Sequence, residues 1–79
     1  MSPTVFRRHN YRFFFFSRAE TRKHIHVVSP EGEAKIWIEP EVVVAGFIGY
    51  NSKHINEIVN LVKENRDEII TKWNTHFGK

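Results

Sequence analysis

Cysteine is absent from this sequence of 79 residues, so the chain can form neither a disulfide nor a thiolate metal site. Long apolar runs are missing too, because no stretch approaches the roughly 20 apolar residues that a membrane-spanning helix needs. The run Phe13–Phe16 is too short for this, and it lacks the small-residue cleavage site of a signal peptide. We therefore expect a soluble, cytoplasmic protein that does not contact a membrane.

Internal repeats, low-complexity tracts and long linkers are also lacking, which indicates one domain over residues 1–79. A chain of this length buries a modest fraction of its surface, and such chains often depend on a partner for part of their stability. The oligomeric state stays open, with a homo-oligomer as one alternative.

The net charge of +3 is unevenly distributed along the chain. Residues 1–35 carry seven Lys or Arg against three Glu, which gives +4, whereas residues 36–79 carry five basic and six acidic residues, which gives −1. A basic half suits phosphate groups or an acidic protein partner. An ordinary solvated surface is the alternative interpretation of the same composition.

Period-two apolar patterns and turn residues predict an antiparallel sheet of four to five strands. The segment Tyr11–Ser17 is apolar on both of its faces, as is typical of a central strand. The turn signals are Asn10, the stretch Ser29–Glu33 and Pro40. The predicted strands are residues 4–8, 11–17, 24–28, 34–39 and 42–46.

A helix is predicted over residues 53–77, with Ser52 as its N-cap and Gly78 at its end. Apolar side chains recur there at helical spacing, so one stripe of the helix should pack on the sheet. The helix either runs unbroken or bends near Asn65. The fold class that follows is α+β, with the sheet first and the helix packed on one face of it.

The stretch KHIHV places two imidazoles two residues apart in a predicted strand. Alternation directs Ile25 and Val27 to one face, so His24 and His26 should point to the face that the helix leaves uncovered. The next strand divides in the same way and adds Lys35, Trp37 and Glu39 to the histidine face. A two-residue loop at Glu31-Gly32 would pair His26 with Trp37 and His24 with Glu39.

Paired imidazoles titrate near neutrality and can act as general base and general acid. Basic neighbours can stabilise an anionic phosphorane-like transition state, and an aromatic ring can stack on a base. This combination is typical of metal-independent ribonucleases. The candidate catalytic residues are His24, His26, Lys35 and Glu39. The candidate substrate-binding residues are Arg22, Lys23, Trp37 and Tyr11.

Other interpretations of the same residues remain open. The sequence calls for no cofactor, but His24 and His26 could hold a divalent metal with Glu39 or Glu20 as a third ligand. The histidines could instead bond backbone groups or line an interface, and Lys35, Trp37 and Glu39 could form an ordinary cross-strand ladder. Trp73 and the phenylalanine run are interpreted as core, and His54 and His76 as surface residues.

Several motifs occur together in a recognisable order: PTVFR, YRFFFFS, HIHV, GEAKIWIEP and EIVNLVKEN, followed by Trp73. In this combination the chain resembles the small prokaryotic family known as domain of unknown function 4160. Members of that family usually carry an acidic residue and a Pro-Pro pair directly before the His-x-His. Here Arg22-Lys23 replaces the proline pair, which makes the loop more basic.

The resemblance implies a two-gene module of toxin–antitoxin type, in which this chain would be the toxin. The partner would be a small protein of the type called domain of unknown function 2442. The first functional hypothesis is accordingly a toxin that acts on RNA through the His-x-His face. The alternative is a non-enzymatic module that binds a protein or nucleic acid without cleaving it.

Overall fold

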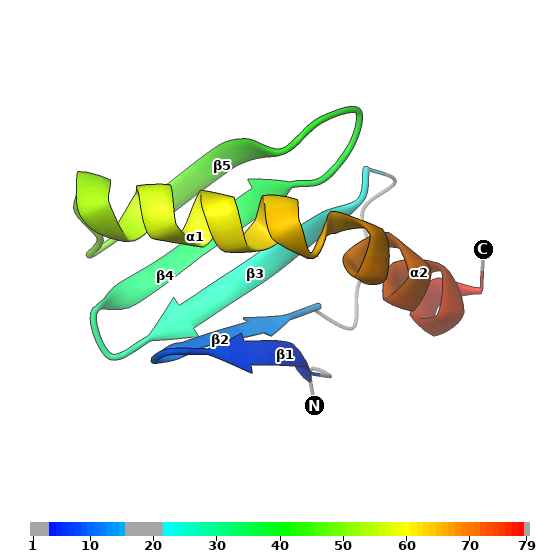
Figure 1. The fold of residues 1–79 in the computed structure, drawn as a ribbon, viewed down its shortest axis with the longest axis horizontal. Helices are drawn as coiled ribbons and strands as arrows, with labels where there is room; N and C mark the ends of the chain where they lie inside the picture. The colour runs from blue at the N-terminus through cyan, green and yellow to red at the C-terminus, as the bar shows by residue number, and fades with distance from the viewer. Residues whose placement is uncertain (1–3, 16–21, 79) are drawn as a thin grey trace.

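The computed structural model describes residues 4–15 and 22–78, and these form five strands and two helices (Figure 1). The elements are β1 (Thr4–Arg8), β2 (Tyr11–Phe14), β3 (His24–Ser29), β4 (Gly32–Trp37), β5 (Val43–Ile48), α1 (Ser52–Glu64) and α2 (Arg66–Phe77). The predicted α+β class, with an antiparallel sheet followed by helix, is confirmed.

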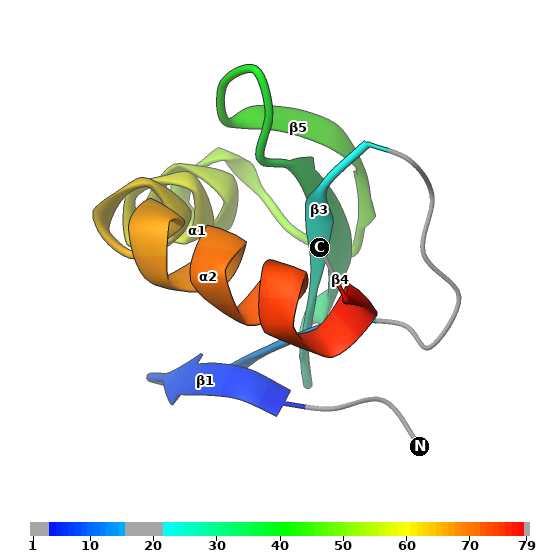
Figure 2. The ribbon, with the colours of Figure 1, turned by 90° about the vertical axis from the view of Figure 1, so that its right-hand side faces the viewer.

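The strands follow one another across the sheet in the order β1-β2-β3-β4-β5, and each neighbouring pair is antiparallel. Both helices lie on the same side of this sheet, as the edge-on view in Figure 2 shows. We call the opposite side of the sheet the far face. In the described part of the chain, no helix combines the length and apolar character needed to cross a membrane.

The core lies between the sheet and the helices. Alternation along the strands supplies its sheet side, and one stripe of each helix supplies the other. The buried members are Val5, Tyr11, Phe13, Phe15, Ile25, Val27, Ala34, Ile36, Ile38, Tyr50, Ile58, Val62, Ile69 and Trp73. The prediction that Trp73 belongs to the core is confirmed, since only 4% of it is exposed.

The register predicted for the third and fourth strands is wrong by two residues. The hairpin loop is Pro30-Glu31, so Ser29 faces Gly32, His24 faces Trp37 and His26 faces Lys35. A shift of two residues leaves every side chain on the same face, because the side-chain period of a strand is also two. The apolar pattern therefore fixes the faces and leaves the partners undetermined.

Four predicted strands differ from the observed ones at their ends, and β3 differs least, since it continues one residue past the predicted range 24–28 to Ser29. β2 ends at Phe14 where the prediction continued to residue 17, and residues 16 and 17 lie outside the described residues. β4 begins at Gly32 and ends at Trp37, whereas the predicted range was 34–39. β5 runs over Val43–Ile48 instead of 42–46, because its pairing with β4 continues to Glu33↔Ile48.

Two glycines lie at the point where the β3–β4 turn meets the end of β5. Gly49 has a positive φ of 86°, which side chains other than glycine rarely adopt. A Cβ atom at Gly49 would overlap the carbonyl oxygen of Glu31, and one at Gly32 would overlap that of Ile48. Glycine at these positions lets the two backbones approach each other.

The helix begins one residue earlier than predicted, and Asn51 replaces Ser52 as its N-cap. The side-chain oxygen of Asn51 accepts a hydrogen bond from the backbone N–H of His54 at 3.0 Å, and the Asn51 N–H donates to His54 Nδ1 at 3.2 Å. Both residue types favour this position, so the sequence alone allowed either. His54 was interpreted as a surface residue, but it is half-buried and completes the cap.

The bend near Asn65 is present and divides the helix into α1 and α2. Asn65 has a backbone conformation outside the helical range, and its side-chain amide donates to the carbonyl of Leu61 at 2.8 Å. An asparagine side chain that bonds backbone in this way competes with the regular helical ladder. α1 then buries Ile58 and Val62, and α2 buries Ile69 and Trp73.

Candidate functional site

The far face carries the two histidines that the sequence analysis selected. β3 directs Ile25 and Val27 into the core, so the rings of His24 and His26 lie on the opposite side. Their ring centroids are 5.0 Å apart. As predicted, the strand directs both rings to the face opposite the helices. The two rings nevertheless differ strongly in their surroundings.

His24 is buried, with 3% of the residue exposed. Its Nδ1 lies 2.9 Å from the carbonyl oxygen of Arg22. A carbonyl only accepts, so Nδ1 carries the proton in this bond. The ring packs edge-on against Trp37 at 5.6 Å and against Trp73 of α2 at 5.2 Å. The expectation that the helix leaves both rings uncovered is therefore wrong for His24, because α2 continues past the bend and brings Trp73 onto it.

His26 is half-buried and stacks on Phe14 of β2, with the ring centroids 5.6 Å apart. Arg12 places its guanidinium carbon 4.7 Å from the centre of the Phe14 ring. The far face thus carries a line of rings that crosses β2, β3 and β4, which we call the ring row. Its members are Phe14, His26, His24 and Trp37.

Two cations approach the indole of Trp37 at the β4 end of the ring row. The guanidinium carbon of Arg22 and the ammonium nitrogen of Lys35 each lie 4.4 Å from the centre of a Trp37 ring. Contacts of this length are within the range of cation–π attraction. The ring row is therefore bordered by positive charge at both ends, from Arg12 on one side and from Arg22 and Lys35 on the other.

Two shallow hollows lie on this surface and share His26, Glu33 and Ala34 in their linings. The first has a volume of about 240 Å³ and is also lined by Lys35 and Ile48. The second has a volume of about 340 Å³ and extends to Arg12 and Phe14. His26 thus lies where the hollows meet, at the accessible part of the ring row.

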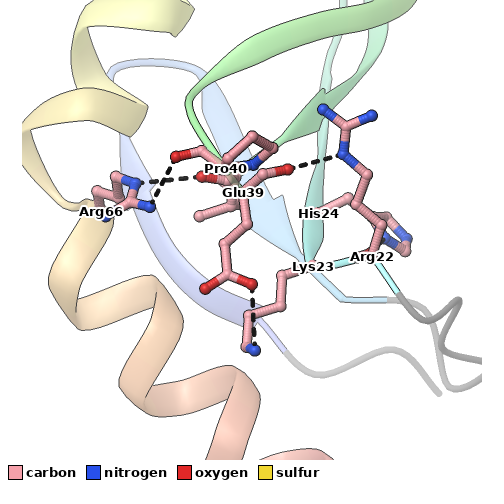
Figure 3. A network of polar contacts seen from close by, with 7 residues as sticks. Arg22, Lys23, His24, Glu39, Pro40 and Arg66 are labelled. Carbon is pink, nitrogen blue, oxygen red and sulfur yellow. Dashed lines mark hydrogen bonds and ion pairs between the residues drawn. The ribbon is translucent and has the colours of Figure 1, made fainter.

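Glu39, a candidate catalytic residue, belongs to a different set of contacts. Its carboxylate accepts a bond from Lys23 Nζ at 3.3 Å, and its backbone carbonyl accepts one from Arg22 Nε at 2.7 Å. In Figure 3 the carboxylate points to Lys23 and away from the ring of His24. Glu39 and Lys23 therefore join the chain before β3 to the loop after β4.

Arg66 holds the same loop from the helix side. It donates from Nε to the carbonyl of Ile38 at 3.1 Å and from its guanidinium end to the carbonyl of Pro40 at 3.4 Å (Figure 3). Arg66 is the first residue of α2, so the bend of the helix is fixed to the end of β4. This contact helps to position Trp73 over His24.

Tyr11, a candidate for stacking on a base, lies on the helix side of the sheet. It is 4% exposed, and its hydroxyl donates to the Glu57 carboxylate at 2.8 Å. Burial, together with this bond and the charge of Glu57, raises the pKa of the Tyr11 phenol well above its usual range. The structure does not bring Tyr11 to the histidines, since it alternates with Arg12 and shares the side of Phe13.

The family described as "Domain of unknown function (DUF4160)" matches residues 10–74 of the chain. The chain belongs to this family. The family resemblance stated from the sequence is thereby confirmed, and the matched region includes the whole ring row together with Trp73. No curated protein matches the chain, and no solved structure matches it.

The sequence analysis of this DUF4160 chain missed two residues of the far face. Phe14 is buried, as the interpretation of the phenylalanine run as core predicted, but its ring lies on the far face, where it faces His26 across the β2–β3 pair and is covered by Arg12. The available signal was the same alternation that placed the histidines, since Arg12 and Phe14 alternate with the core residues Tyr11 and Phe13.

A metal site on this DUF4160 chain was an open alternative. Among residues 4–15 and 22–78, no three His, Cys, Asp or Glu side chains gather as metal ligands. Glu20, one of the two carboxylates considered, lies outside these residues, and Glu39 is bonded to Lys23. The groups that the described residues bring together on the far face are aromatic rings and cationic side chains.

Proposed function

We propose that this protein binds single-stranded RNA on the far face of its sheet. The observation that carries the proposal is the indole of Trp37 at the end of the ring row, with the cations of Arg22 and Lys35 each 4.4 Å from the centre of one of its rings. Proteins that bind single strands combine a positive surface for the phosphates with rings or guanidinium planes for the bases. Both components occur here on one side of one sheet.

The charge of the far face supports this choice of ligand. Arg7, Arg12 and Lys35 alternate with core-facing residues on their strands, and Arg22 reaches the same side over Trp37. Glu33 is the acidic residue that lies among them in the described strands. A surface with this excess of positive charge attracts a polyanion, and the hollows beside His26 give room for a base.

The two histidines take different roles in this proposal. His26 is half-buried, lies across from Lys35 and lines both hollows, so it is the imidazole placed to touch bound RNA and to exchange a proton with it. His24 is enclosed by Trp37 and Trp73 and donates to a backbone carbonyl. His24 is therefore a positioning residue, which holds the indole of Trp37 at the surface.

The family resemblance extends the proposal to a biological setting. We infer that the chain is the toxin of a two-gene module in the cytoplasm, with a protein of the domain of unknown function 2442 type as its antitoxin. An RNA target accounts for growth inhibition, since engaging cellular RNA interferes with translation. The partner would then relieve the inhibition by covering the far face or by holding the chain in an inactive complex.

The test is the affinity of the purified protein for a labelled, unstructured RNA, measured by fluorescence anisotropy at several salt concentrations. Trp37→Ala should weaken binding about tenfold, since stacking contributes roughly 1–3 kcal/mol per base. Lys35→Gln should weaken binding and reduce the salt slope by about 1. Lys63→Gln is the matched control, because Lys63 is exposed on α1 and should leave both quantities unchanged. Affinity that is indifferent to salt, or equal losses for Lys35→Gln and Lys63→Gln, would contradict the proposal.

Denaturing gels of the same mixtures separate binding from cleavage. If the RNA stays intact in the presence of wild type, the far face binds RNA without cleaving it. If wild type cleaves the RNA and His26→Ala does not, His26 takes part in proton transfer. Expression in cells gives the second readout. Wild type should arrest growth, Trp37→Ala should relieve the arrest, and the neighbouring small protein should do the same. A Trp37→Ala chain that arrests growth as strongly as wild type would remove the link between RNA binding and toxicity.

A further inference from the structure

Glu33 is the one carboxylate that the described strands direct to the far face, and it lines both hollows beside His26. The residue is exposed, and within residues 4–15 and 22–78 its carboxylate takes part in no hydrogen bond or ion pair. A negative group repels the phosphates that the neighbouring cations attract. Its place among these cations therefore points to a ligand group other than phosphate.

The surroundings of Glu33 in the first hollow are apolar on one side and cationic on the other. Ile48 faces Glu33 across the β4–β5 pair and is 74% exposed. Gly46 faces Lys35 in the same pair, and a Cβ atom at Gly46 would meet nothing within 4 Å. The lack of a side chain at Gly46 leaves the hollow open beside Lys35 and Ile48. A flat group with an apolar face and a polar edge fits these neighbours.

The charges around the hollows restrict the class of ligand. An ionised carboxylate only accepts hydrogen bonds, so Glu33 requires a ligand that carries N–H or O–H donors. Lys35 lines the first hollow and Arg12 the second, so a cationic donor from a protein partner, such as an arginine side chain, would meet like charges. A neutral donor carried by an anionic chain meets both conditions, and a base of RNA is such a group.

The four RNA bases differ in the donors that they offer to a carboxylate. Guanine presents N1–H and N2–H side by side on its Watson–Crick edge, so both carboxylate oxygens can accept at once. Cytosine and adenine place an amino group beside an unprotonated ring nitrogen, and uracil places one N–H between two carbonyl groups. In these three bases an acceptor would face one of the carboxylate oxygens, which costs binding free energy.

We propose that the far face binds a guanine base beside His26, with the Glu33 carboxylate accepting hydrogen bonds from guanine N1–H and N2–H. This inference rests on the proposed binding of single-stranded RNA and names the base that the site prefers. Ile48 contacts the base through its exposed apolar side chain, and Lys35 attracts the neighbouring phosphate. Glu33 is then the residue that determines specificity, whereas the cations determine the affinity shared by all RNA sequences.

The test uses labelled single-stranded RNAs of equal length that contain uridine at every position except one in the centre. That position carries uridine, adenosine, guanosine or inosine, which is guanosine without the 2-amino group. Fluorescence anisotropy with the full chain should give the guanosine strand an affinity about tenfold higher than the inosine strand, because one of two paired hydrogen bonds is lost. The adenosine strand controls for the stacking of a purine and should bind no more tightly than the inosine strand.

Glu33→Gln separates specificity from charge. The variant should bind the guanosine and inosine strands equally, because the amide offers one acceptor oxygen in place of two. It should bind the uridine strand at least as tightly as wild type does, because a negative charge leaves the surface. Glu64→Gln is the matched control: Glu64 is exposed on α1, loses the same charge and should keep the preference for guanosine.

The outcomes distinguish this inference from the proposed function on which it rests. Wild type that binds all four strands equally, with an affinity that falls as salt rises, would overturn the choice of guanine and leave RNA binding intact. Wild type that binds none of the strands would overturn both proposals. A preference for guanosine that Glu33→Gln retains would overturn the role of Glu33, since another group would then recognise the base.

Discussion

His24 shows how a residue chosen for chemistry can serve structure instead. Its Nδ1–H donates to the carbonyl of Arg22, and its ring packs against the indoles of Trp37 and Trp73. An imidazole in such a position is hydrogen-bonded and packed at the same time, so it contributes to stability in two ways. The arrangement also joins the strand end of β3 to Trp73 of α2, which links the far face to the core.

Replacing His24 should therefore cost stability. His24→Ala removes a buried ring and a hydrogen-bond donor, and we expect the free energy of unfolding to fall by about 2–4 kcal/mol. His76→Ala, on the exposed side of α2, should change it by about 1 kcal/mol or less. Urea unfolding followed by circular dichroism measures both. His24→Asn keeps a donor near the same carbonyl and should recover part of the loss. Equal stability of His24→Ala and wild type would show that the ring is dispensable.

Tyr11 gives a prediction for high pH. Its pKa is raised mainly by burial, so the folded protein holds the phenolic proton more tightly than the unfolded chain does. The stabilisation is complete below the ordinary phenol pKa of 10.0 and is lost as the pH rises above it, because ionising the buried group favours unfolding. Tyr11→Phe should be less stable than wild type at neutral pH and should lose less stability between neutral and high pH.

Urea unfolding at matched pH values provides the measurement for Tyr11. Burial raises the pKa of Tyr50 as well, so Tyr50 makes the stability of both wild type and Tyr11→Phe depend on high pH. The difference between the two stability curves removes this shared contribution. Parallel curves for wild type and Tyr11→Phe above the phenol pKa would contradict the assignment.

At the scale of elements, the turn between β3 and β4 depends on glycine. The sequence placed Gly32 inside the loop, whereas the structure places it in β4 directly beside the end of β5. This contact explains why the hairpin adopts the Pro30-Glu31 loop, since it leaves Gly32 and Gly49 where the backbones meet. Alternation could not reveal this, because it carries no information on a shift of two residues.

Gly49→Ala should destabilise the protein by about 1–3 kcal/mol, because alanine would have to adopt a positive φ and would also overlap the Glu31 carbonyl. Gly46→Ala is the matched control within β5. A Cβ atom at Gly46 meets nothing within 4 Å, so we expect a change within about 0.5 kcal/mol. Thermal unfolding of the two variants at equal low concentration makes the comparison. Equal melting temperatures would show that the close approach is easily relaxed.

The helices illustrate both success and failure of prediction from local signals. The apolar stripe and the possibility of a bend at Asn65 were readable in the sequence, because spacing and an asparagine are local features. The anchoring of Arg66 to the loop after β4 was not readable, since it joins residues 28 positions apart. That contact sets the direction of α2, and the direction of α2 decides whether His24 is covered.

At the scale of the whole molecule, the separation into a core side and a far side followed from alternation on each strand. His24, His26, Lys35 and Trp37 were correctly grouped for that reason. Tyr11 was wrongly added to them as a substrate-binding candidate, since the same rule places it on the helix side with Phe13. The accessibility of each ring could not be predicted, because it depends on how far a helix extends over the end of a sheet. Cross-strand register and the path of the helix are both long-range properties.

The contacts of His24 have a practical consequence for spectroscopy. The chain contains two tryptophans, and both of their indoles touch this one imidazole. Intrinsic emission therefore originates beside a single histidine, one indole on the sheet and the other on the terminal helix. Unlabelled protein can thus signal an occupant of the surface through Trp37 and a displacement of α2 through Trp73, and single phenylalanine replacements assign each signal to its source.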